Sequence, residues 1–243
     1  MNVVEEIKKK REFSSLPDSI VERAALMSKD DVKESRALLR KYFGVFLTNK
    51  VLKGKGSADE ILAAHMSSKK RDYGEFYGKI FSGEVGSVVD LGCGVNGFSY
   101  SYLPKGVRYV GVEAAGQLVD STNRYFRDRG FEMAHVMKGD LFDVENVLNI
   151  LRNVEKPRVV FMFQVVDALE NLERDFSKKF ILEIAEECEK IVLSLPTESL
   201  GGRKKFAVQR KWIVDFLEEN FLIEKDFRMS GERVIVIKNK TND

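Results

Sequence analysis

The chain has 243 residues, of which 44% are hydrophobic and 32% are charged, and its formal net charge is +2. This length supports one large domain, and the composition excludes collagen-like, low-complexity and wholly disordered proteins. A charge this close to zero gives no overall field that would attract nucleic acid. The two cysteines and two histidines are too few for a disulfide framework or a zinc site, so we expect no metal.

The sequence also argues against a membrane protein. No apolar run approaches the ~20 residues that a membrane-spanning helix needs. Residues 1–15 mix acidic and basic side chains where a secretory signal would be apolar. No heptad pattern indicates a coiled coil. We therefore expect a cytoplasmic monomer with no membrane partner.

Residues 1–56 predict a small helical subdomain. Pro17 marks a helix start, and the stripe of an amphipathic helix follows at Leu38, Leu39, Tyr42, Phe43 and Phe46. A glycine- and lysine-rich stretch at 53–57 indicates a linker. The region carries 13 Lys and Arg against 8 Asp and Glu. We expect residues 1–56 to form one unit and residues 57–243 to form the main domain, with helical spacing resuming over 58–81.

From residue 85 onward, short β-branched runs alternate with helical patterns, which indicates βαβ units and a mainly parallel sheet. The expected strands cover residues 85–92, 107–113, 132–140, 157–163 and 190–196, and the expected helices cover 116–130, 144–154, 170–189 and 207–220. Two β-rich runs separated by Ser-Gly end the chain over 221–239. This pattern predicts an antiparallel hairpin at the edge of the sheet.

A glycine-rich loop follows the first of these expected strands. Gly92, Gly94 and Gly97 have the spacing G-x-G-x-x-G, and Glu113 follows 21 positions after Gly92 at the end of the next strand. Glycines let the backbone approach a ligand closely, and an acid at the second strand end can accept hydrogen bonds from ribose hydroxyls. A helix is expected after the loop. The pattern predicts a cofactor that contains a nucleoside.

Two cofactors fit this pattern, a dinucleotide and S-adenosylmethionine, and four features favour the second. Asp90 gives the form D-x-G-x-G that is common in methyltransferases, and the motif lies well inside the chain. Asp140 ends the third strand, where a carboxylate can accept from an adenine amino group. The C-terminal hairpin suits a methyltransferase better than a dehydrogenase. We therefore expect the α/β, Rossmann-like fold of S-adenosylmethionine-dependent methyltransferases, a seven-stranded and mainly parallel sheet with an antiparallel C-terminal hairpin, and the ligand at the carboxyl ends of its strands.

Three segments resemble a known family. They are HMSSKKRDYGEFYGKIF (65–81), VVDLGCGVNGFS (88–99) and VLSLPTESLGGRKKF (192–206). They are similar in order and spacing to the aminoglycoside-resistance 16S ribosomal RNA (guanine-N7) methyltransferases of the Arm/Rmt/Sgm type. The chain departs from that pattern at Gly97, where the family has Pro, at Lys70, where it has Glu, and at Ser68, where it has Thr. The resemblance is to a divergent member, and it implies that the N-terminal helices dock on RNA.

The resemblance also implies roles for individual residues. Arg71 resembles the family's clamp for the methionine carboxylate, a role that suits a guanidinium. The other cofactor-binding residues that it implies are Asp90, Gly92, Gly94, Glu113, Asp140, Leu141 and Gln164. Ser194, Ser199 and Arg203 match the segment that closes over target and cofactor, and are expected to position them. No residue is assigned as a catalytic base.

The implied partner is the small ribosomal subunit with its 16S-type RNA. We expect phosphate contacts from basic residues in the N-terminal region and in the stretch 203–211, namely Lys41, Lys50, Lys204, Lys205, Arg210 and Lys211. Guanine N7 carries a lone pair at neutral pH, so its methylation requires alignment rather than a base. Two alternatives stay open at this point: a methyltransferase that acts on tRNA or a small molecule, and a nucleotide-binding module without catalysis.

Overall fold

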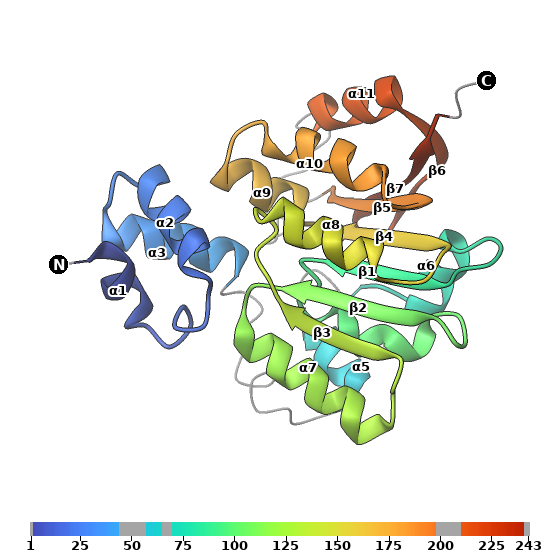
Figure 1. The fold of residues 1–243 in the computed structure, drawn as a ribbon, viewed down its shortest axis with the longest axis horizontal. Helices are drawn as coiled ribbons and strands as arrows, with labels where there is room; N and C mark the ends of the chain where they lie inside the picture. Colours follow the sequence, from blue (N-terminus) through green and yellow to red (C-terminus); the bar gives the residue numbers. More distant parts are fainter. Residues whose placement is uncertain (1, 44–56, 65–69, 198–209, 241–243) are drawn as a thin grey trace.

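The computed structural model describes residues 2–43, 57–64, 70–197 and 210–240. Its centre is a seven-stranded sheet with the strand order β3-β2-β1-β4-β5-β7-β6, which Figure 1 shows beside a separate group of N-terminal helices. The strands are β1 (Ser87–Leu91), β2 (Arg108–Glu113), β3 (Ala134–Lys138), β4 (Arg158–Phe163), β5 (Lys190–Pro196), β6 (Phe221–Met229) and β7 (Glu232–Asn239). Strands β1 to β5 are parallel, and β7 runs antiparallel to both of its neighbours.

The sequence-based prediction of this sheet is confirmed. Each of the first five strands lies within the predicted range, and β6 and β7 form the predicted C-terminal hairpin. The order places β1 in the interior of the sheet, so the strand before the glycine loop is paired along both edges, with β2 and with β4. Its five residues are all buried, as expected for a parallel strand between two helical layers.

Helices cover both faces of the sheet. Buried side chains of α8 (Val144–Arg152), α10 (Phe176–Ala185) and α11 (Lys211–Asn220) pack against one face. The opposite face is covered by α5 (Ala58–Ala64), α6 (Tyr73–Ile80) and α7 (Gly116–Arg129). Alternate residues of β1 divide between the two layers, since Val88 belongs to one apolar cluster and Val89 to the other. The pleat of the strand therefore explains the two cores.

Two predictions about helices are wrong in detail. The single helix expected over 170–189 is split into α9 (Val166–Leu172) and α10. Glu173 is extended and Asp175 has a left-handed backbone with φ 63°, while the Glu170 carboxylate accepts hydrogen bonds from the Asp175 amide at 2.7 Å and the Ser177 hydroxyl at 2.6 Å. These two bonds hold the turn that separates α9 from α10, and hydrophobic periodicity does not reveal such local side-chain bonds. The helix expected after the glycine loop is the 3₁₀ helix η2 (Asn96–Tyr102).

The N-terminal region forms a small helical bundle. Its helices are α1 (Val3–Lys8), α2 (Asp18–Met27) and α3 (Val32–Tyr42). Ile7, Phe13, Leu16 and Leu39 are fully buried within it, and Figure 1 shows the bundle in blue at one end of the molecule. The predicted boundary at residue 56 lies outside the described residues, so the division into 1–56 and 57–243 stays a prediction.

Polar contacts join this bundle to the carboxyl edge of the sheet, and one of them is a hydrogen bond from the Gln117 side-chain amide to the Arg11 carbonyl at 2.9 Å. The Ser15 hydroxyl donates to the side-chain oxygen of Gln117, the Ser19 hydroxyl donates to Asp140, and Arg23 pairs with Glu173. We call these three pairs the N-terminal contact. It brings α2 and the segment before it against the start of α7, the residue pair after β3 and the end of α9. These segments follow β2, β3 and β4, at the edge where the sequence places the ligand.

Within the described ranges, no helix is long and apolar enough to cross a membrane. The same residues contain no group of three or more His, Cys, Asp or Glu side chains that could hold a metal ion. Cys93 and Cys188 are both free thiols.

Candidate cofactor and target site

The glycine loop lies at the end of β1 and has the backbone that its glycines predict. Gly92 has φ +69° and Gly94 has φ +52°, a region that residues with a side chain rarely adopt. A Cβ built on Gly92 would lie 2.8 Å from the Cγ2 atom of Val165. Both the backbone conformation and the space therefore require glycine at position 92, where the loop packs closely against Val165 between β4 and the next helix.

The third glycine has a different reason. Gly97 lies in η2, and a Cβ at this position would lie 2.6 Å from the Cγ2 atom of Thr122 on α7. It therefore permits close packing between the turn after the loop and the helix after β2, which is the usual role of the last glycine in this motif. The departure from proline at this position is compatible with the fold.

Glu113, at the end of β2, is bonded to the backbone of the glycine loop. Its Oε2 atom accepts from the Gly94 amide at 2.9 Å, and its Oε1 atom accepts from the Ala115 amide at 2.8 Å. Burial raises the pKa of Glu113, and backbone hydrogen bonds from Ala115, Gly94 and Ala114 oppose that rise. Each carboxylate oxygen can accept a second hydrogen bond, so this side chain can hold the loop and still receive ribose hydroxyls.

Asp90 lies buried beneath the loop. Its Oδ2 atom accepts from the Asn96 side-chain amide at 2.7 Å and from the Tyr109 hydroxyl at 2.8 Å, whereas its Oδ1 atom is buried and accepts no hydrogen bond. Burial raises the pKa of Asp90 to about 6, against the hydrogen bonds from Asn96 and Tyr109. A buried acceptor without a donor is costly, so the unmatched Oδ1 atom marks a position that a donor group of a ligand or a water would stabilise.

Arg71 lies near the same loop but is already paired. Its Nε and Nη2 atoms donate to the two carboxylate oxygens of Glu232 at 2.9 and 2.7 Å, and its Nη1 atom lies 3.5 Å from the side-chain oxygen of Asn96. The exposed fractions of the Arg71 and Glu232 side chains are only 4% and 3%. Burial alone would lower the pKa of Arg71, but the charge of Glu232 raises it above its usual value.

A buried polar cluster therefore backs the glycine loop. We define it as Arg71, Tyr77, Asp90, Asn96, Ser99, Tyr109 and Glu232. Tyr77 and Ser99 share a hydrogen bond of 2.6 Å between their hydroxyls, and the Asn96 amide also lies 3.2 Å from the Tyr77 hydroxyl. The sequence analysis assigned only Arg71 and Asp90 to the site. Asn96 stands in the quoted loop and could have been found there, whereas Glu232 lies more than a hundred residues away and only the fold reveals it.

Asp140 and Leu141 follow β3. The Oδ1 atom of Asp140 accepts from the Phe142 amide at 2.9 Å, and its Oδ2 atom accepts from Ser19 in the N-terminal contact. Leu141 is buried, and its Cδ1 atom would lie 3.7 Å from a Cβ on Gly92. The structure thus places the Asp140–Leu141 pair beside the glycine loop.

Gln164 follows β4 and has a left-handed backbone with φ +58°. Its backbone N–H donates to the backbone carbonyl of Ser194 at 3.0 Å. This bond joins the ends of β4 and β5. Ser194 is fully buried, and its hydroxyl oxygen makes no hydrogen bond. The predicted cofactor residues therefore lie along one edge of the sheet, at the ends of β1 to β4, and in the segment before α6.

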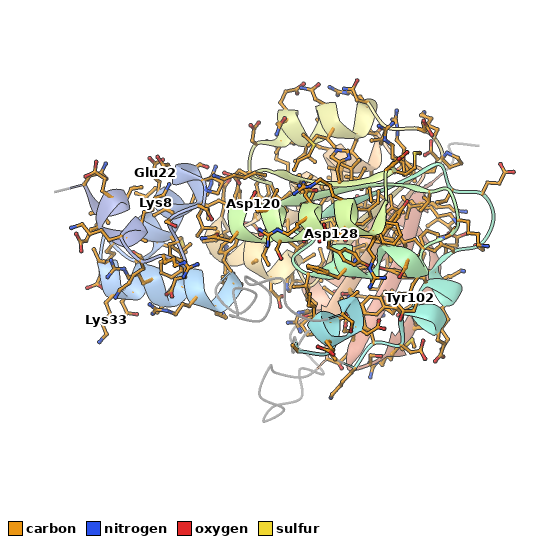
Figure 2. The ribbon with its side chains drawn as sticks, turned by 90° about the horizontal axis from the view of Figure 1, so that it is seen from below. Lys8, Glu22, Lys33, Tyr102, Asp120 and Asp128 are labelled. Carbon is orange, nitrogen blue, oxygen red and sulfur yellow. The ribbon has the colours of Figure 1, made fainter. Side chains whose placement is uncertain are left out.

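Several predicted residues lie outside the described ranges, namely Ser199, Arg203, Lys204, Lys205 and Lys50. Among the described ones, Lys41 is exposed on α3, and Lys211 is exposed although it pairs with Asp215 at 2.6 Å. Figure 2 shows Lys8, Glu22 and Lys33 together on the N-terminal bundle, so acidic and basic side chains both occur on its surface.

Arg210 has a structural partner. Its Nε atom donates to both carboxylate oxygens of Asp167 at 2.9 and 3.1 Å, and its Nη1 atom donates to the Pro196 carbonyl at 2.7 Å. The side chain is only 14% exposed. It fastens the start of α11 to the end of β5, and a phosphate contact by Arg210 stays a prediction.

The aromatic side chains near η2 make contacts within the fold. The Tyr100 hydroxyl donates to the Val107 carbonyl at 3.0 Å, and its ring packs on Tyr109, Phe126 and Phe131. Tyr102 is exposed and donates to Asp59 at 2.8 Å, and Figure 2 shows it far from the N-terminal bundle along the long axis. The packed ring of Tyr100 is part of the core.

Comparison with solved structures identifies the fold. The chain is similar to an rRNA methylase from Escherichia coli, at 18% identity and a TM-score of 0.76 over 98% of both chains. It is also similar to the 16S rRNA methylase RmtB, at 19% identity and a TM-score of 0.75 over 99% of both chains. A third similar structure is the 16S rRNA methyltransferase RmtF in complex with S-adenosyl-L-homocysteine, at 19% identity and a TM-score of 0.76 over 98% of this chain and 97% of that one.

No family model matches the sequence, and neither does any curated protein. The three structural likenesses show that the chain shares the fold of rRNA methylases along almost its whole length, including the N-terminal helices, at low sequence identity. The expected α/β methyltransferase fold is confirmed by the strand order and by these likenesses.

Proposed function

We propose that this chain is an S-adenosylmethionine-dependent RNA methyltransferase that modifies guanine N7 in the RNA of the small ribosomal subunit. The observation that carries the proposal is the glycine loop with Glu113 bonded across it, at the carboxyl edge of a methyltransferase sheet. The likeness to rRNA methylases over 98% of the chain supports RNA as the class of substrate.

The residues present fit such a cofactor. Gly92 gives the loop the left-handed backbone, φ +69°, that the close turn at the end of β1 requires. Glu113 would accept from the ribose hydroxyls and Asp140 from the adenine amino group, as acids at these strand ends can. The buried Oδ1 atom of Asp90 lacks a donor, and the cofactor's ammonium group is a donor of the right kind. Arg71 would bind the carboxylate of the amino-acid part.

When bound, the cofactor would supply a methyl group on a sulfonium centre. The N7 atom of guanine has a lone pair at neutral pH and needs no deprotonation, so the protein acts by holding the base in line with that methyl group. Alignment of this kind can contribute up to roughly 7 to 11 kcal/mol. The buried Ser194 hydroxyl at the end of β5 and the segment that follows it are our candidates for positioning the base.

We assign the small ribosomal subunit as the partner on the basis of the resemblance and the two basic regions of the sequence. Lys41 and Lys211 are exposed and could contact phosphates. RNA binding should then weaken as salt concentration rises, because each phosphate contact releases a counterion. A cytoplasmic location and a monomeric state belong to the same proposal.

The decisive experiment supplies the protein with methyl-labelled S-adenosylmethionine and, in separate reactions, small ribosomal subunits, naked ribosomal RNA and tRNA. Any labelled guanine is mapped by chemical cleavage at N7-methylguanine. We expect label at a single cleavable guanine of the small-subunit RNA. Label on tRNA would favour the first alternative, and cofactor binding without label on any RNA would favour a non-catalytic role. Strong binding of NAD in place of S-adenosylmethionine would overturn the site assignment.

A second experiment tests the RNA-binding stretch. Lys204→Glu together with Lys205→Glu reverses two positive charges that the sequence places after the fifth strand. RNA binding should weaken and its salt dependence should become less steep, while the dissociation constant for S-adenosylhomocysteine stays within twofold. Equal loss of RNA and cofactor binding would contradict the assignment.

A further inference from the structure

The ion pair between Arg71 and Glu232 brings together two segments that lie far apart in the sequence. Arg71 precedes α6, and Glu232 is the first residue of β7, the antiparallel strand of the C-terminal hairpin. Both carboxylate oxygens of Glu232 are used, one on Nε and one on Nη2 of the guanidinium. This bidentate geometry fixes the plane of the guanidinium as well as its position.

The other surroundings of Arg71 restrict where a further anion can bind. The rings of Phe76 and Phe163 lie with their centroids 4.9 Å from the guanidinium carbon, and they offer no polar partner for an anion. A guanidinium has five N–H groups, of which Glu232 uses one on Nε and one on Nη2. The N–H groups that Glu232 leaves belong to the Nη1 end, which lies toward Asn96, and to Nη2.

The Nη1 end of the guanidinium is the end that contacts the residues after the glycine loop. Asn96 lies 3.5 Å from Nη1 through its side-chain oxygen and donates to Asp90 through its amide at 2.7 Å. Glu232, Arg71, Asn96 and Asp90 therefore form one chain of polar contacts that runs from the hairpin to the end of β1. Through these contacts, the position of the guanidinium is linked to Asn96 and to Asp90 beneath the glycine loop.

Charge compensation adds a second reason for Glu232. A guanidinium that is 4% exposed is unstable without an anion beside it. Glu232 supplies that anion before any ligand arrives, so the Arg71 side chain is held in one place in the ligand-free protein. Preorganisation of this kind removes the cost of ordering the side chain when the ligand binds.

We propose that Glu232 is the positioning residue for Arg71: it holds one edge of the guanidinium so that the Nη1 end faces the glycine loop and receives the carboxylate of the cofactor's amino-acid part. The inference rests on the proposed function, since it assumes a ligand with such a carboxylate. It assigns to the C-terminal hairpin a part in recognising the amino-acid end of the ligand.

The test compares two ligands that share a nucleoside and a thioether. S-Adenosylhomocysteine has the amino-acid part, and 5′-methylthioadenosine lacks it. In Glu232→Gln, the dissociation constant for S-adenosylhomocysteine measured by calorimetry should rise 5- to 50-fold, while that for 5′-methylthioadenosine should change less than twofold. Arg71→Gln should abolish the preference between the two ligands, and adding Glu232→Gln to it should change that preference no further.

A matched control comes from the same hairpin. Arg233 and Asp226 form an ion pair that is 27% and 35% exposed, and Asp226→Asn should leave both dissociation constants unchanged. Because Glu232→Gln leaves a buried charge unpaired and could prevent folding, Glu232→Asp provides a second measurement. It keeps the charge but shortens the side chain, and should reduce the ligand preference at least twofold in a protein that still folds.

The outcomes separate the inference from the function on which it rests. Equal weakening of both ligands by Glu232→Gln, or of both by Glu232→Asp, would mean that Glu232 only supports the fold and would overturn the inference. Unchanged binding of S-adenosylhomocysteine in the folded variants would overturn it as well. A wild-type protein that binds neither ligand would instead contradict the proposed function.

Discussion

The buried polar cluster behind the glycine loop and the N-terminal contact both border the carboxyl edge of the sheet, but they differ in burial and in connectivity. In the cluster, Asp90 and Glu232 are fully or almost fully buried, and each has at least two hydrogen bonds from neighbouring side chains. In the N-terminal contact, Ser19 is exposed, and the Arg23 and Glu173 side chains are 32% and 42% exposed.

The difference teaches which part of the site is rigid and which is adjustable. Removing one partner of a buried ion pair costs about 3 to 5 kcal/mol because the other charge is left unpaired, whereas an exposed pair contributes about 0 to 1 kcal/mol. The cluster therefore fixes the floor of the glycine loop in the ligand-free protein. The polar pairs of the N-terminal contact are weak by comparison, and a docking partner could exchange them at little cost.

The largest effect is expected from a substitution at Gly92, in the glycine loop that the buried polar cluster supports. Gly92→Ala combines a left-handed backbone with a Cβ that would lie 2.8 Å from Val165, so the free energy of unfolding should fall by at least about 2 kcal/mol. Binding of S-adenosylhomocysteine should become undetectable by calorimetry. Gly130→Ala is the matched control, because Gly130 has φ +68° but no atom within 4 Å of the added Cβ. It should lose about 1 kcal/mol of stability and keep its ligand affinity.

The pH dependence of stability reports on the burial of Asp90. Its pKa is raised to about 6 by burial, above the value of about 3.9 for an unfolded chain. Between these values the native state binds the proton more tightly than the unfolded state, so the contribution of Asp90 to stability decreases as pH rises from about 4 to 6.

Asp90→Asn removes this titration. The difference in free energy of unfolding between the variant and the wild type should shift in favour of the variant by up to about 3 kcal/mol from pH 4 to pH 7. Urea unfolding of both proteins at several pH values provides the measurement. A difference that stays constant across this range would show that Asp90 does not titrate as a buried group.

Glu113 tests the link between the loop and the ligand. Glu113→Ala removes the acceptor for the Gly94 and Ala115 amides. The variant also lacks the carboxylate that we propose for the ribose hydroxyls. We expect the dissociation constant for S-adenosylhomocysteine to rise about 10- to 50-fold. Glu155→Ala, at an exposed position that pairs with Arg108 at 3.9 Å, serves as control. Unchanged affinity in Glu113→Ala would contradict the ribose role.

The smallest effect is expected in the N-terminal contact. Ser19→Ala removes an exposed hydrogen bond to Asp140 and should change the free energy of unfolding by less than about 1 kcal/mol. The affinity for S-adenosylhomocysteine should change less than fivefold. Ser14→Ala removes a hydroxyl that bonds only locally, to the Arg11 carbonyl at 2.9 Å, and should have no effect. A loss in Ser19→Ala as large as that in Glu113→Ala would mean that the two regions are equally rigid.

The sequence by itself determined the strands, the C-terminal hairpin and the glycine loop. These features depend on local rules: β-branched runs for strands, the spacing of Gly92, Gly94 and Gly97 for the loop, and a Ser-Gly turn for the hairpin. The positions of Asp90, Glu113 and Asp140 at strand ends were also predictable, because the carboxyl ends of parallel strands meet at one edge of the sheet.

Only the tertiary structure decided the partners of these residues. Glu232 is paired with Arg71, and Arg210 with Asp167. The partners of each pair lie so far apart in the sequence that no local pattern predicts their contact. The turn between α9 and α10 is held by the Glu170 carboxylate, which accepts from the Asp175 amide and the Ser177 hydroxyl. A buried charge must find its counterion wherever the fold brings one within reach, so ion pairing is decided by packing in three dimensions and not by position along the chain.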